Sequence, residues 1–199
     1  LDHLAYPLGG MGTGMICLEG AGALSHVSVR GEPNVHNEPL VFAALAIKGA
    51  PELARVLEGP VPEWKIFSPP EAGNGLGGTD YGLPRFDAAS FTARFPFGTV
   101  RLEDGAIPLQ VEITGWSPFT PGDPDNSSLP VAALEYNFHN PTDAPVDAIF
   151  SFHARNFMAP PNSIGAAGAA VLATENGFVL WQAGSEEKPW EQGAFSAVA

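Results

Sequence analysis

The stretch Ile107-Pro-Leu109-Gln-Val111-Glu-Ile113-Thr114 alternates apolar and polar residues along its length. Such alternation is typical of a β-strand with one face in a core and the other in water. Similar patterns occur on both sides of it, at residues 24–30, 40–48, 91–95, 98–103, 131–138, 146–153 and 178–182. Helical periodicity is nearly absent, and only Pro51 to Leu57 could form a helical turn or two. The sequence therefore predicts an all-β protein.

Turn-forming residues separate these predicted strands. The chain has 23 Gly and 20 Pro, well above average usage. Asp104-Gly105 and Asn176-Gly177 are dipeptides that favour hairpins, and the run Asn-Pro-Thr-Asp-Ala-Pro at 140–145 predicts another antiparallel hairpin between its flanking strands. We therefore expect an antiparallel, supersandwich-like β-sandwich, with Greek-key and meander connections both open. Residues 1–199 are expected to form one domain, truncated relative to the complete sandwich.

The composition excludes several classes of function. The net charge is −13 with only nine Lys and Arg, so we expect neither nucleic-acid nor membrane-surface binding. No apolar run reaches the roughly 18 residues of a transmembrane helix, and no signal peptide is visible at the start. The compartment stays open between cytoplasm and periplasm. Cys17 is the single cysteine and is predicted to be a buried core residue.

The stretch Gly9-Gly-Met-Gly-Thr-Gly14 allows two interpretations, a nucleotide-binding loop or a glycine-rich turn. A dinucleotide loop follows a strand and opens a helix, whereas this stretch precedes an apparent strand. No Gly-Lys-Ser or Gly-Lys-Thr follows it, as a P-loop requires. We favour a turn in which glycine lets two backbones approach closely.

No pattern predicts a metal or a cofactor. The histidines stand singly, at His3, His26, His36, His139 and His153. The run Asp123-Pro-Asp125-Asn-Ser127 begins like a calcium loop, but Ser128 replaces the sixth-position glycine and Leu134 the twelfth-position glutamate. An Asx turn is the favoured interpretation, and we expect no cofactor and no metal site.

Catalytic residues are equally hard to identify. A glycosidase needs two carboxylates about 5–10 Å apart, yet no pair stands out among the 22 acidic residues. Trp64 and Trp116 could stack on sugar rings, although tryptophan is also a common core anchor. Trp64 is the more interesting because it lies in a long Pro- and Gly-rich stretch, residues 60–84, whose length exceeds that of usual loops.

Three stretches together resemble a known family. They are Trp116-Ser-Pro-Phe-Thr-Pro, Asn126-Ser-Ser-Leu-Pro130 and the run from Val131 to Val146. In this order they resemble the N-terminal domain of glycoside hydrolase family 116, the family of the non-lysosomal glucosylceramidase and related bacterial β-glucosidases. Residues 7–14 and 55–59 are also similar to that family, so the resemblance spans most of residues 6–158.

The resemblance implies an N-terminal β-sandwich beside a C-terminal (α/α)6 barrel, which would carry the catalytic Glu and Asp of a retaining enzyme acting on β-glucosides. That barrel is expected to lie outside these residues, so the chain alone is predicted to be inactive. The alternative is a stand-alone carbohydrate-binding or structural interaction module. We expect two loops, Gly9–Gly14 and Trp116–Ser128, to face the barrel. The candidate pocket or interdomain residues are Gly10, Gly12, Trp64, Trp116, Asp125 and Asn126.

Overall fold

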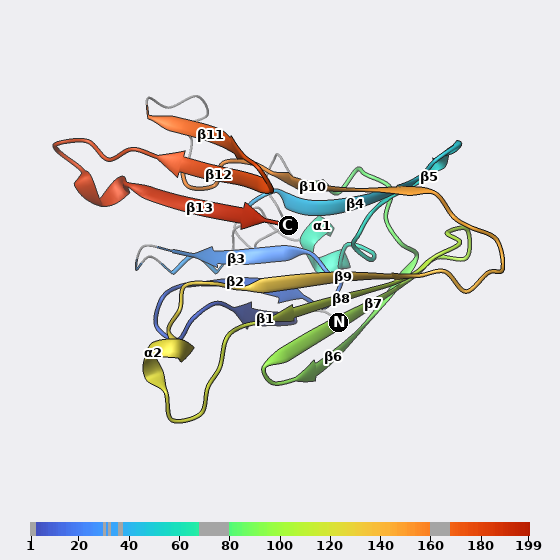
Figure 1. Ribbon diagram of the computed structural model, residues 1–199, viewed down its shortest axis with the longest axis horizontal. Helices are drawn as coiled ribbons and strands as arrows, with labels where there is room; N and C mark the ends of the chain where they lie inside the picture. The colour runs from blue at the N-terminus through green and yellow to red at the C-terminus, as the bar shows by residue number, and fades with distance from the viewer. Residues whose placement is uncertain (1–2, 30, 32, 36–37, 68–79, 160–167) are drawn as a thin grey trace. The chain divides into compact units, whose positions relative to one another are not determined.

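The computed structural model of this chain describes residues 3–29, 31, 33–35, 38–67, 80–159 and 168–199. These residues form two compact units, Leu1–His153 and Ala154–Ala199, each described here by itself. Strands dominate both units, and every strand pair with an assigned register is antiparallel (Figure 1). The prediction of an all-β, antiparallel fold is confirmed.

The first unit contains three sheets. The first sheet has the order β1 (Ala5–Leu8), β2 (Met15–Glu19) and β3 (Leu24–Ser28). The second has the order β10 (Ala148–Ala154), β4 (Val41–Ile47) and β5 (Ala50–Val56). The third has β6 (Ala88–Arg94), β7 (Phe97–Glu103), β8 (Gln110–Trp116) and β9 (Ala133–His139) in sequence order. Two short helices, α1 (Glu63–Phe67) and α2 (Pro124–Ser127), lie in connections.

The four-stranded sheet packs its inner face against both of the other sheets. At Gly115 of β8 a Cβ atom would lie 2.9 Å from the side chain of Leu8 in β1. The contact with the second sheet is made by the same face, where the ring of Tyr136 in β9 lies 5.2 Å from the ring of Phe150 in β10. Alternate residues of β7 and β8, such as Ile113, are buried between the sheets, and each such side chain contributes about 1.5–3 kcal/mol. A sandwich-like core results, as predicted.

Two local predictions are wrong. Residues 51–57, expected as a helical turn or two, lie largely in β5, where Arg55 pairs with Leu45 of β4. Residues 140–145 do not close a hairpin, because β9 pairs with β8 while β10 pairs with β4. The side chains of Asn140 and Thr142 close this turn, since Asn140 Nδ2 and Thr142 Oγ1 both donate to the carbonyl of Ala144, at 2.7 and 3.0 Å. The chain can therefore cross from one sheet to another without pairing the two strands.

Other local predictions are confirmed. The Asp104-Gly105 dipeptide lies in the connection of the β7–β8 hairpin. Cys17 is buried, and burial raises the pKa of its thiol to about 11. Among the described helices, none has the length and hydrophobicity needed to cross a membrane.

The second unit is a three-stranded antiparallel meander. Its strands are β11 (Ala169–Thr174), β12 (Gly177–Gln182) and β13 (Gly193–Val198). The predicted hairpin between β11 and β12 is present; Glu175 and Asn176 form its turn, and Gly177 begins β12, paired with Thr174. Asn156 anchors the start of the unit, because its Nδ2 donates to the carbonyls of Ala170 and Trp181 at 3.2 and 3.0 Å.

Candidate functional site

The glycine-rich stretch at residues 9–14 forms the connection between β1 and β2. A strand follows it, so this stretch lacks the strand-to-helix context of a dinucleotide-binding loop. Gly9, Gly12 and Gly14 have φ angles of +135°, +76° and +97°, a region that residues with a Cβ rarely adopt. The favoured interpretation, a turn that needs glycine, is confirmed.

This turn is hydrogen-bonded to the connection between β8 and β9, residues 117–132. The backbone N–H of Gly9 donates to Ser117 Oγ at 2.8 Å. The backbone N–H of Met11 donates to the carbonyl of Ser127 at 2.9 Å. Two segments separated by about a hundred residues therefore form one surface.

Gly10 allows the closest approach between these two connections. A Cβ atom at this position would lie 2.2 Å from the carbonyl oxygen of Leu129. Such a distance is a direct collision with backbone, so a larger side chain requires the two connections to separate. A Cβ atom at Gly12 would meet no other atom within 4 Å, so the role of Gly12 is the left-handed turn alone.

The helix α2 occupies the β8–β9 connection. Asp123 caps it, because Asp123 Oδ1 accepts from the backbone N–H of Asn126 at 3.0 Å. The backbone and side-chain amides of Asn126 hold the pKa of Asp123 below its usual range. This is an Asx cap rather than a calcium loop, and no cluster suited to a metal ion occurs in the described part of the chain. Asp125 lies exposed in the first turn of the helix.

Aromatic side chains surround these connections. Trp116 ends β8, and its Nε1 donates to Glu135 Oε1 at 2.7 Å. Its ring lies 6.4 Å from the ring of Phe97 at the start of β7. Beside them, Phe95 of the β6–β7 turn meets Phe119 edge to face, with ring centroids 4.8 Å apart.

We call this region the loop end. It comprises the connections at residues 9–14, 95–96 and 117–132 together with Phe97 and Trp116. Figure 1 shows these connections at one end of the first unit, with α2 among them. Five of the six candidate residues from the sequence lie here: Gly10, Gly12, Trp116, Asp125 and Asn126.

Trp64, the sixth candidate, lies in α1 instead. Its ring stacks on His3 at 4.6 Å with an angle of 25° between the planes. The ammonium of Lys65 lies 5.6 Å from the same ring, and Trp64 Nε1 is buried without a hydrogen-bond partner. These contacts favour a packing role over an open sugar-stacking platform.

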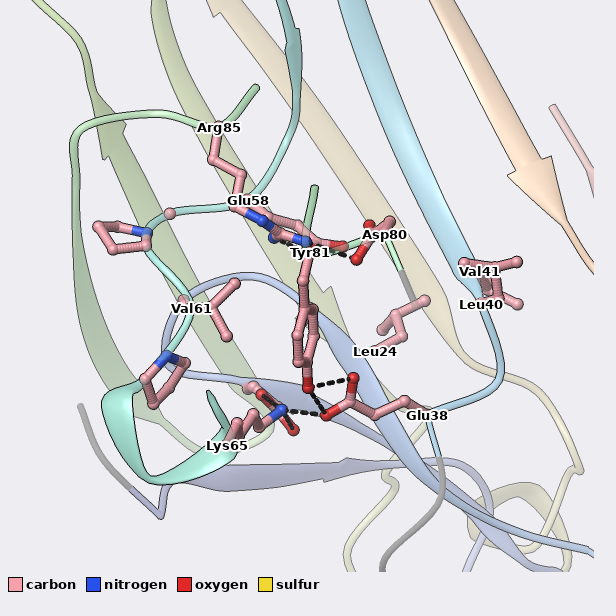
Figure 2. A pocket seen from close by; sticks show the side chains of 16 residues that line it. Leu24, Glu38, Leu40, Val41, Glu58, Val61, Lys65, Asp80, Tyr81 and Arg85 are labelled. Carbon is pink, nitrogen blue, oxygen red and sulfur yellow. Dashed lines mark hydrogen bonds and ion pairs between the residues drawn. The ribbon is translucent and has the colours of Figure 1, made fainter. Parts of the chain in front are cut away.

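Beside α1 lies a cluster of buried charged side chains, which we call the buried cluster (Figure 2). Lys65 Nζ contacts Glu19 Oε2 at 2.6 Å and Glu38 Oε1 at 2.5 Å. The hydroxyl of Tyr81 donates to Glu38 at 2.7 Å. Arg85 completes the cluster by pairing with Glu58 and Asp80.

Burial and charge act together on the pKa values in this cluster. Burial alone lowers the pKa of Lys65, but Glu19 and Glu38 outweigh it and raise that pKa above its ordinary value. Burial and the hydrogen bond to Glu38 raise the pKa of Tyr81. Burial raises the pKa of Glu58 to about 7, because the guanidinium beside it offsets the desolvation only in part.

The buried cluster leaves little room for chemistry. The free volume between its side chains is about 20 Å³, enough for about one water molecule and not for a sugar ring. Each carboxylate is already bonded to Lys65 or Arg85. The cluster therefore ties β2, α1 and the segment around residues 80–85 together. The sequence does not predict this cluster, because its members are scattered from residue 19 to residue 85. The one available signal is that Lys65 and Arg85 each lie in an otherwise apolar segment.

Comparison with known proteins agrees with this architecture. A family model described as "beta-glucosidase 2, glycosyl-hydrolase family 116 N-term" matches residues 5–192. No curated protein shows significant similarity to the chain. The match defines an all-β N-terminal domain of a glycoside hydrolase. The chain belongs to glycosyl-hydrolase family 116, which confirms the resemblance seen in the sequence, and an N-terminal domain of such an enzyme implies a catalytic partner domain.

Proposed function

We propose that this chain is the non-catalytic N-terminal sandwich of a retaining β-glucosidase or glucosylceramidase-like enzyme. In this proposal it packs against an (α/α)6 catalytic domain and shapes the rim of the substrate pocket. The family match supports the type of enzyme. The observation that carries the proposal is the loop end, where two distant connections are hydrogen-bonded into one surface.

The carboxylates of the buried cluster and of the outer sheet face support a non-catalytic role. Retaining hydrolysis needs two carboxyl groups about 5–5.5 Å apart, one of them a nucleophile and the other a proton donor, with room for the sugar between them. The carboxylates of the buried cluster are paired in a space too small for a sugar. On the outer sheet face, Glu112 pairs with Arg101 at 2.9 Å and Glu135 holds Trp116. We assign both catalytic groups to the partner domain.

The loop end also offers groups that suit a pocket rim. Asp125 and Asn126 lie on α2 and are exposed, so they can reach sugar hydroxyls at the mouth of a neighbouring pocket. Trp116 adds an aromatic edge whose N–H is already fixed by Glu135. Loops carried on a rigid sheet are common positions for residues that select a substrate.

The test uses the full protein that contains this chain. A 2-deoxy-2-fluoro-β-glucoside traps the glycosyl-enzyme intermediate of a retaining enzyme on its nucleophile. Peptide mapping should place the label outside these 199 residues. A label on any Asp or Glu of this chain would contradict the proposal, and so would loss of turnover in the variant Glu112→Gln.

A further inference from the structure

We infer that the buried cluster is a proton-sensitive latch, in which the loss of one proton releases residues 80–85 from the end of β5. The inference uses only residues of the first unit and does not depend on the proposed function. It goes beyond the structural role of the cluster, because it assigns to one part of the fold a local opening that responds to pH.

The segment at residues 80–85 is bonded to the end of β5 through both backbone and side chains. The backbone N–H of Val56 donates to the carbonyl of Pro84 at 2.9 Å. The guanidinium of Arg85 pairs with the carboxylate of Glu58. Phe86 follows, with its side chain buried and its backbone N–H bonded to the carbonyl of Glu58 at 3.0 Å. Phe86 is therefore the fixed point at which an opening of this segment would end.

One guanidinium in this contact serves two carboxylates. Arg85 Nη2 lies 2.5 Å from Asp80 Oδ1, while Nη1 donates to Glu58 (Figure 2). The side chains of Arg85, Asp80 and Glu58 are only 10%, 11% and 5% exposed. If both carboxylates are ionised, one negative charge has no counter-ion of its own, and an uncompensated charge away from water is costly.

The other half of the cluster does not supply the missing positive charge. Lys65 already contacts two carboxylates, those of Glu19 and Glu38. Four carboxylates therefore surround two cations in this cluster. A proton held by one carboxylate reduces the surplus of negative charge, so the packed arrangement is expected to favour a protonated form.

Glu58 is the carboxylate best placed to hold this proton, since its side chain is the least exposed of the four. The charged and titratable groups that face it are Arg85 and Asp80 on the segment, Glu19 in β2 and Tyr136 in β9. Burial raises the pKa of Glu58 to about 7, and Arg85 offsets this effect only in part. The proton is therefore bound in mildly acidic solution and lost near neutral pH.

The loss of the proton strains the contact at its weaker side. Ionised Glu58 and Asp80 repel each other across the guanidinium that they share. Glu58 cannot move easily, because the N–H of the preceding Leu57 is bonded to the carbonyl of Ala43 in β4 at 2.8 Å. Asp80 belongs to a segment whose residues 82–84 are exposed. The segment, and not β5, is expected to move.

This movement also affects the lysine half of the cluster. The hydroxyl of Tyr81 donates to Glu38 at 2.7 Å, and the guanidinium of Arg85 lies 5.8 Å from the centre of the Tyr81 ring. Displacing the segment breaks both contacts and opens the cluster to water. The latch is therefore closed at low pH and open at higher pH.

Hydrogen exchange of backbone amides in the full protein tests the latch. The N–H of Val56 is bonded to Pro84, whereas that of the adjacent Leu57 is bonded to Ala43 in β4 and is the internal control. After correction for the intrinsic pH dependence of exchange, the rate of Val56 should rise about tenfold or more from pH 5 to pH 8, as proton linkage predicts. It should then exceed the rate of Leu57. An unchanged corrected rate for Val56, or equal rates for the two amides at pH 8, would overturn the inference.

Three variants assign this rise to the cluster. Glu58→Gln has no proton to lose, so Val56 should exchange at the same corrected rate at both pH values. Asp80→Asn relieves the repulsion and should reduce the rise, which provides a second test if Glu58→Gln does not fold. Glu112→Gln is the control and should keep the full rise, because Glu112 forms an exposed pair with Arg101. A full rise in either cluster variant, or an equal reduction in the control, would overturn the inference.

Discussion

The buried cluster and the loop end both depart from the usual arrangement of residues. The first holds charged groups inside the protein, and the second holds hydrophobic side chains at its surface. In the buried cluster, Lys65 and Arg85 lie inside the protein with four carboxylates around them. At the loop end, hydrophobic side chains such as Phe95 and Met11 lie in water. Charges usually lie outside and large hydrophobic groups inside, so each region requires an explanation.

The difference lies in whether the unusual groups already have partners. Every charge in the buried cluster is paired within the chain, which is how a protein tolerates ions away from water. The exposed side chains of the loop end remain accessible to solvent despite their contacts with one another. A satisfied buried cluster indicates a structural role, whereas an exposed apolar surface indicates a partner outside the chain.

The largest effect is expected when the buried cluster loses its lysine. Lys65→Met leaves Glu19 and Glu38 buried without their cation, which should cost about 3–5 kcal/mol of unfolding free energy. Urea denaturation followed by tryptophan fluorescence measures this cost. The control is Lys188→Met, because Lys188 forms an exposed pair with Glu191 and its loss should cost below about 1 kcal/mol. Equal losses for both variants would show that the buried cluster is not structural.

The second prediction concerns the pH dependence of stability. Because the pKa of Glu58 is raised to about 7 in the fold from an ordinary 4.5, the folded state binds the extra proton between these values. Stability should therefore fall as pH rises from about 5 to 7, by at most about 3 kcal/mol from this group. Glu58→Gln removes the titration and should flatten the profile, and the difference between the two profiles isolates Glu58 from general acidic repulsion. Parallel profiles would contradict this assignment.

A smaller effect is expected at the contact between the two loops. Gly10→Ala should destabilise the domain by about 1–3 kcal/mol, because its Cβ collides with the carbonyl of Leu129. The matched control is Gly105→Ala in the β7–β8 connection, where a Cβ has open space and φ is not positive. Thermal unfolding of both variants measures the contrast. A neutral Gly10→Ala would mean that the two loops are not held together as the structure shows.

The smallest effect is expected at the exposed rim of the loop end. Glu135→Ala removes the acceptor for Trp116 Nε1 but leaves that N–H close to solvent, so the loss should stay near about 1 kcal/mol or below. The emission of Trp116 should shift as its environment changes. Glu112→Ala is the control, since Glu112 pairs with Arg101 on the same sheet face without touching Trp116. An identical spectrum for both variants would contradict the contact.

The sequence predicts those features that depend on local patterns. Alternation around Val111 and Ile113 predicts the strand, and Asn176-Gly177 predicts the hairpin, because each is determined by neighbouring residues. Pairing between distant segments cannot be predicted in this way. The run at 140–145 carries hairpin residues, yet its flanking strands join different sheets, a choice made by the core and not by the turn.

The candidate site shows the same limit. The sequence predicts the loops at 9–14 and 116–128 separately, but only the fold shows that Gly10 contacts Leu129. Residue type alone groups Trp64 with the loop residues as a candidate. In the fold, Trp64 lies in α1 and its ring stacks on His3. The pairing within the buried cluster could not be predicted, since no spacing links Glu19 to Lys65 before the chain folds; the cations in apolar segments indicate only that partners are needed.

The proposed function requires that the catalytic domain covers the loop end in the full protein. Hydrogen peroxide oxidation followed by mass spectrometry tests it through Met11, which is 59% exposed in this domain and readily oxidised when accessible. Met11 in the full protein is expected to be oxidised as slowly as the buried Met158. Oxidation of Met11 at the rate of an exposed methionine would contradict it.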